Sequence, residues 1–212
     1  DVEVEALADD TPAVKEIATR LASGTKRADI EAAIERMTAG LQSVDHGSSE
    51  PALTELGKLL GAEAYKPPGQ GRCDSAWCWS ERIWIAVEAK TEHEPDGDIP
   101  MKDIRQANTQ LESLAADRGV SIPTLSVDVI VSPRSRIHAD AVAIARPFVY
   151  VVQPKTLREL ADSIQDAWKD LLVRYRGHSG ADLENLVRRV FAEYRTLPTQ
   201  VRERLTTDPV RP

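Results

Sequence analysis

The stretch RIWIAVEAKT, residues 82–91, reads as a buried strand, yet its end carries two opposite charges, Glu88 and Lys90. Period-two alternation along a strand places both charges on the face that also carries Trp84. A carboxylate and an ammonium on one face of an apolar strand are the residue types of metal-assisted hydrolysis. We therefore ask which other side chain the fold can bring to this face.

The preceding run CDSAWCWS can form a hairpin with this strand, and the length of the turn decides which residues meet. With a three-residue turn, Trp79 pairs with Ile83, and Asp74 then lies directly opposite Glu88. A two-residue turn would instead pair Asp74 with Val87. The first register predicts a carboxylate pair, and the second removes it.

In the first register Asp74 and Glu88 have Cβ atoms about 5 Å apart, a like-charge pair that is unfavourable unless a cation lies between them. Oxygen ligands without His or Cys favour Mg2+ or Mn2+. Lys90, two residues past Glu88, would reach a phosphate or the attacking water and stabilise the developing negative charge. The pattern predicts phosphodiester hydrolysis, although a Glu-x-Lys pair on a strand is more often a solvated ion pair.

Around this hairpin, periodicity and turn residues predict a core that runs helix, three strands, helix, strand, helix, strand, helix from residue 51. Two amphipathic helices, 13–24 and 27–44, precede it. The core elements are expected within residues 52–60, 62–68, 73–80, 82–91, 98–119, 125–133, 138–145, 148–154 and 156–175.

Composition places the chain among soluble proteins with one core. It has 212 residues, 42% of them hydrophobic, and a net charge of −7, and it shows no apolar run near the roughly 20 residues of a membrane span. Two cysteines, expected as free thiols, are typical of a reducing compartment, so we expect a cytoplasmic protein. Because the sequence begins with Asp1 and lacks a signal peptide, we expect it to be part of something longer. The expected division is an N-terminal helical extension (1–48), a core (49–175) and a basic C-terminal helical segment (176–212).

Together, Asp74, Glu88, Lys90 and the order of elements resemble the PD-(D/E)XK nuclease superfamily over roughly residues 51–153. The resemblance implies an α/β restriction-endonuclease-like fold, an αβββαβ core with a mixed central sheet flanked by helices. Asp74 matches the first acid of the motif, and Glu88 and Lys90 in EAK match its E-x-K. Cys73 stands where the motif has its nominal proline.

The resemblance also implies further site residues. Glu55 matches a helix acid that some members use as an additional metal ligand, so the implied metal ligands are Asp74, Glu88 and Glu55. Gln106 falls where RecB-like members carry a glutamine, although Gln110 stands where that subfamily has a tyrosine. Both glutamines could equally be solvated.

The implied activity is that of a Mg2+-dependent or Mn2+-dependent nuclease acting on DNA, working with other domains or partner subunits in bacterial defence or DNA processing. Two alternatives stay open: a catalytically silent module that binds nucleic acid or partner domains, and another metal-assisted hydrolase. The acidic net charge favours the silent module, because DNA affinity requires lysines and arginines.

His93 could assist at the scissile phosphate, or it could be a surface histidine with a raised pKa. Three hairpin tryptophans, Trp77, Trp79 and Trp84, are expected to cover a core edge more often than to stack on bases. Basic residues that could contact DNA are Lys66, Arg72, Lys102, Arg188, Arg189, Arg195, Arg202 and Arg204. The tail arginines could equally lie on a helix that packs against a neighbouring element.

Overall fold

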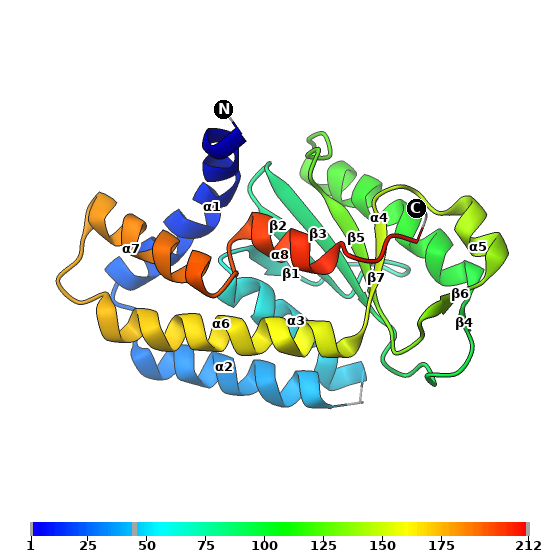
Figure 1. Ribbon diagram of the computed structural model, residues 1–212, viewed down its shortest axis with the longest axis horizontal. Coiled ribbons are helices and arrows are strands. Elements are labelled where there is room, and N and C mark those ends of the chain that lie inside the picture. The colour runs from blue at the N-terminus through cyan, green and yellow to red at the C-terminus, as the bar shows by residue number, and fades with distance from the viewer. Residues whose placement is uncertain (1, 44–45, 211–212) are drawn as a thin grey trace.

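A mixed β-sheet lies between two layers of helices in the computed structural model, which describes residues 2–43 and 46–210 (Figure 1). Within those residues one sheet has five strands in the order β1-β2-β3-β5-β7. The strands are β1 (Glu63–Tyr65), β2 (Ser75–Trp79), β3 (Ile83–Ala89), β5 (Val127–Val131) and β7 (Val149–Val152). The class is therefore α/β, as the sequence predicts.

Strand directions change in the middle of the sheet. β1, β2 and β3 are joined as antiparallel neighbours, whereas β5 runs parallel to β3, and β7 runs parallel to β5. Two neighbouring parallel strands must be joined by a crossover connection. Here the crossover between β3 and β5 contains α4 (Met101–Arg118). The carboxyl ends of β3 and β5 therefore lie side by side.

The remaining helices surround this sheet. They are α1 (Val2–Ala22), α2 (Arg27–Gln42), α3 (His46–Leu59), α5 (Ala139–Ile144), α6 (Pro154–Arg174), α7 (Gly180–Glu193) and α8 (Pro198–Leu205). In Figure 1, α4 and α5 lie on one side of the sheet, whereas α2, α3, α6 and α7 lie toward the other.

Alternation along β3 divides its side chains between two cores. Ile83, Ile85 and Val87 belong to the large core under α3 and α6, whereas Trp84 and Ala86 belong to a smaller core under α4. Every residue of β3 is buried, because helices cover both faces of the sheet. Glu88, on the Ala86 side, therefore points into the α4 layer.

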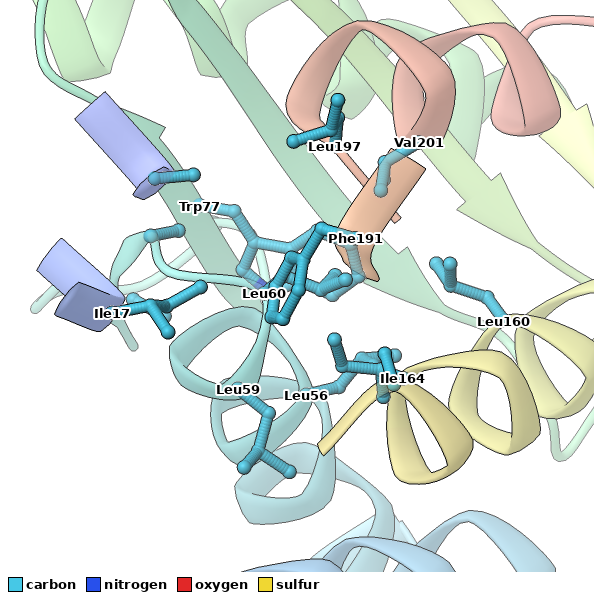
Figure 2. Packing of buried hydrophobic residues seen from close by; sticks show 14 of the residues in the cluster. Ile17, Leu56, Leu59, Leu60, Trp77, Leu160, Ile164, Phe191, Leu197 and Val201 are labelled. Carbon is cyan, nitrogen blue, oxygen red and sulfur yellow. The ribbon is translucent and has the colours of Figure 1, made fainter. Parts of the chain in front are cut away.

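The large core crosses all three of the predicted segments. α1 and α2 contribute from the N-terminal segment, and α7 and α8 contribute from the C-terminal one. Figure 2 shows part of this packing, with Ile17, Leu56, Leu59, Leu60, Trp77, Leu160, Ile164, Phe191, Leu197 and Val201. Phe191 meets Trp168 edge-on at 6.2 Å between ring centroids, which joins α7 to α6.

Four elements differ from the sequence prediction. α1 begins at Val2 and continues through Pro12, rather than beginning at residue 13. α3 begins at His46 and contains Pro51, rather than beginning near residue 52. A small parallel pair, β4 (Asp98–Ile99) with β6 (Arg136–Ile137), was not predicted, because two-residue strands leave no periodic signal. Residues 1, 44–45 and 211–212 of the predicted terminal segments lie outside the described part.

The tail arginines largely make contacts within the molecule. Arg188 donates to the carbonyl of Leu7, and Arg202 donates to the carbonyl of Leu125 at 2.7 Å. Arg204 donates to Ser163 of α6 at 3.1 Å. These contacts agree with the expectation that the tail packs against neighbouring elements.

Candidate functional site

The β2–β3 hairpin has the register on which the candidate site depends. Trp79 pairs with Ile83 across a three-residue connection, and Ser75 pairs with Val87. One step further, the backbone N–H of Asp74 donates to Val87 at 2.9 Å. Asp74 Oδ2 accepts from the backbone N–H of Ala89 at 2.7 Å. The predicted three-residue turn and the pairing of Trp79 with Ile83 are confirmed, and Asp74, directly before β2, bonds to the residues on either side of Glu88.

Glu88 is the most unusual member of the site, because its carboxylate is buried without a hydrogen-bond donor. The residue is 1% exposed, and among the described residues neither carboxylate oxygen has a hydrogen-bond partner. Burial raises the pKa of Glu88 to about 8, against a lowering effect of Lys90 and a further raising effect of Asp74. A charged carboxylate in this position requires a nearby cation.

Lys90 directly follows β3, and its backbone N–H donates to the carbonyl of Val131 at 2.7 Å. Its ammonium lies 3.8 Å from Oδ1 of Asp103, which is buried in the first turn of α4. The Lys90 side chain is 17% exposed, so it reaches the surface of the site, whereas Glu88 does not.

His93 lies in this cluster and is not a solvated loop residue. Its Nδ1 is 3.2 Å from the Ser132 hydroxyl, and its Nε2 is 3.4 Å from Oδ2 of Asp103. Burial and then Arg134 lower the pKa of His93, and the opposing effect of Asp103 does not compensate. The raised pKa expected for a surface histidine is therefore wrong, because burial and Arg134 lower the pKa of His93.

Lys66 provides a second ammonium, on the Asp74 side of the site. Its Nζ is 3.2 Å from Asp74 Oδ1, and it also pairs with Glu50 of α3. Burial lowers the pKa of Lys66, but the hydrogen bond to Glu50 and the charge of Asp74 raise it by more. Glu55, the predicted helix acid, instead faces Arg36 of α2 at 3.5 Å. One contact between α3 and Asp74 therefore runs through Glu50 and Lys66.

Gln110, rather than Gln106, orders the segment that leads into Asp74. Gln110 is 1% exposed, its Oε1 accepts from the backbone N–H of Cys73 at 2.7 Å, and its Nε2 donates to Gly71 at 2.8 Å. Of the two alternatives left open for Gln110, the solvated one does not hold, because its side chain is buried. Gln106 lies one turn earlier and is half-buried, and its backbone carbonyl accepts a hydrogen bond from Nε2 of Gln110 at 3.0 Å.

Asp128 on β5 is a buried acid that the sequence reasoning missed. It is fully buried, and neither carboxylate oxygen has a hydrogen-bond partner among the described residues. Burial and then Glu88 raise the pKa of Asp128 well above its ordinary value. The signal was present in LSVDVIV, an acid within an apolar strand, which is the same anomaly that identified Glu88 in RIWIAVEA.

The hairpin tryptophans and cysteines have structural roles. Trp77 and Trp79 donate their indole N–H groups to the carbonyls of Leu53 and Leu60. All three tryptophans are buried, as the core interpretation predicts. Both cysteines are buried free thiols. Of the basic residues near the site, Arg72 is held by Asp117 of α4.

Asp74 and Glu88 supply the hard oxygen donors that Mg2+ uses, and the unpartnered carboxylate of Glu88 fits a cation. Within residues 2–43 and 46–210, no three His, Cys, Asp or Glu side chains already enclose a metal-sized space. A Mg2+ site with one or two protein carboxylates and several waters does not require three. The donor set is therefore compatible with Mg2+.

In the described part of the chain, no helix has the length and apolar character needed to cross a bilayer. Comparison with protein-family models, with curated proteins and with solved structures found no match. The chemistry of the site is therefore the basis on which a function can be inferred.

Proposed function

We propose that this chain is a divalent-metal-dependent nuclease domain of restriction-endonuclease-like fold that hydrolyses phosphodiester bonds of DNA. One observation carries the proposal: Glu88 is buried without a hydrogen-bond partner, beside Asp74 on one side and Lys90 on the other. An acid that only stabilised the fold would be expected to have hydrogen-bond donors, whereas a metal ligand keeps its oxygens free for the ion.

The order of elements supports the same proposal. Apart from the two-residue strand β4, the elements from α3 to β5 have the αβββαβ order that the resemblance implies. Asp74 precedes β2, and Glu88 and Lys90 lie at the end of β3. The hairpin register brings these three residues together at one end of the two strands.

Each residue has a distinct part in the proposed reaction. Asp74 and Glu88 would hold Mg2+ or Mn2+, which when bound supplies charge stabilisation at the phosphoryl group and acidifies a water molecule. Lys90 would orient that water or stabilise the negative charge that develops on the phosphate. Lys66, 42% exposed and already paired with Asp74, is positioned to contact a backbone phosphate.

The different exposure of the site residues supports these separate roles. Glu88 is almost fully buried, whereas the side chains of Asp74 and Lys90 are 12% and 17% exposed. A phosphate would therefore approach from the side of Asp74, Lys66 and Lys90, with Glu88 beneath the ion. The net charge of −7 restricts DNA contact to a local surface and favours delivery of DNA by other domains or partner subunits, as in bacterial defence or DNA processing.

The test is cleavage of supercoiled plasmid and of single-stranded DNA by the purified chain with Mg2+ or Mn2+. We expect Lys90→Ala and Glu88→Gln each to lower the rate by about 10² to 10³-fold, as loss of a charge-stabilising group does. Lys155→Ala is the matched control, because Lys155 is 77% exposed on α6. Equal rates for the wild-type chain and Lys90→Ala would contradict the proposal.

A catalytically silent module is the second candidate. Its support is the pairing of Lys90 with Asp103 and the lack, in the described residues, of three ligands already gathered around an ion. Such a module would bind no Mn2+ in calorimetry, and Glu88→Gln would leave its cellular role unchanged. Mn2+ binding that is lost in Glu88→Gln excludes this candidate.

A further inference from the structure

We propose that Asp128 is an additional carboxylate of the metal site, holding the ion beside Glu88 either directly or through a water molecule. This inference rests on the proposed function and extends it to a strand, β5, outside the Asp74, Glu88 and Lys90 motif.

The pairing of β5 with β3 places Asp128 beside Glu88. β5 is parallel to β3, with Ala86 opposite Asp128 and Glu88 opposite Ile130. Asp128 is thus the diagonal neighbour of Glu88, on the same face of the sheet, and side chains at diagonal positions lie within reach of each other. After burial, the charges of Asp128 and Glu88 both raise the pKa of Cys73, and the charge of Glu88 raises the pKa of Asp128, which agrees with this placement.

Asp128 has none of the partners that a structural acid normally has. It is 0% exposed, and both of its oxygens lack a hydrogen-bond partner among the described residues. The adjacent strand positions on the opposite face, Val127 and Val129, are plain core. A buried charge without hydrogen bonds is destabilising, so an acid at this position requires a compensating role.

With every acid of the site ionised, as metal ligation requires, the charge around the site is unbalanced in the absence of a bound cation. The cluster joins five carboxylates to two ammonium groups: Glu50, Asp74, Glu88, Asp103 and Asp128 with Lys66 and Lys90. Lys90 is the nearby cation that acts on both Glu88 and Asp128, and it also pairs with Asp103 at 3.8 Å. One divalent cation beside Glu88 and Asp128 would supply two of the missing positive charges.

The test measures Mn2+ binding to the full chain by isothermal titration calorimetry, with thermal unfolding in the presence and absence of Mn2+. We expect Asp128→Asn and Asp128→Ala to weaken Mn2+ binding by about tenfold or more, as loss of a group at a metal site does. The rise in unfolding temperature caused by Mn2+ should shrink, while the unfolding temperature of the metal-free protein should not fall. Asp162→Asn, on an exposed position of α6 across the sheet, should bind Mn2+ like the wild-type chain.

The outcomes separate this inference from the proposed function. If the wild-type chain binds Mn2+, Glu88→Gln does not, and both Asp128 variants bind with wild-type affinity, Asp128 is outside the metal site while the nuclease proposal stands. A metal-free Asp128→Asn protein that unfolds at a lower temperature would assign Asp128 a structural role and also overturn the inference. No Mn2+ binding by the wild-type chain would overturn both.

Discussion

Replacing Glu88 by glutamine should change the stability of the metal-free protein in a pH-dependent way. The pKa of Glu88 is about 8 in the fold, chiefly because of burial, against an ordinary value of 4.5. Between these values the folded state holds a proton that the unfolded state has released. The free energy of unfolding of the wild-type chain therefore falls as the pH rises from about 4.5 to 8, and this contribution levels off above pH 8.

The size of the effect follows from the same two values. A difference from 4.5 to about 8, at about 1.4 kcal/mol per pKa unit, sets an upper limit of about 5 kcal/mol. Relaxation of the neighbours and entry of water reduce such penalties, so we expect about 2 to 4 kcal/mol. Glutamine has the shape of the protonated glutamate, so Glu88→Gln should match the wild type near pH 5 and exceed it by this amount at pH 9.

The assay is urea unfolding between pH 5 and pH 9 in a chelating buffer, with linear extrapolation of the free energy at each pH. Glu112→Gln is the matched control, because Glu112 is exposed on α4 and its replacement should change stability by less than about 0.5 kcal/mol at every pH. Parallel curves for Glu88→Gln and the wild type would refute the reasoning, because they would mean that Glu88 is as well solvated in the fold as in the unfolded chain.

Three further substitutions test the packing around the site by urea unfolding at one pH. Gly57→Ala should destabilise by about 1 to 3 kcal/mol, because the added Cβ would clash with the Trp77 ring; a gain in stability from better helix propensity would contradict this. Gln110→Leu should lose about 1 to 3 kcal/mol, because the buried N–H of Cys73 loses its acceptor; unchanged stability would mean that water replaces the amide. Phe191→Ala should lose about 3 to 5 kcal/mol, and a neutral result would show that α7 does not share the large core.

Local patterns were sufficient for much of the fold. The alternation in RIWIAVEAKT and the apolar spacing in 98–119 predicted β3 and α4, and both exist. The sequence left two registers open for the hairpin, and the structure has the one with the three-residue turn, in which Trp79 pairs with Ile83. The beginnings of α1 and α3 were not predictable, because Pro12 and Pro51 read as helix starts when only local preference is considered.

The candidate site was likewise only partly predictable from the sequence. The sequence by itself identified Asp74, Glu88 and Lys90 as candidates, because a three-residue turn makes them neighbours across one hairpin. The tertiary structure alone decided that Asp103, Gln110 and Asp128 join them. These residues arrive through the crossover helix and a parallel strand, whose packing against β3 depends on contacts distant in sequence. No local spacing encodes which of their side chains will face Glu88.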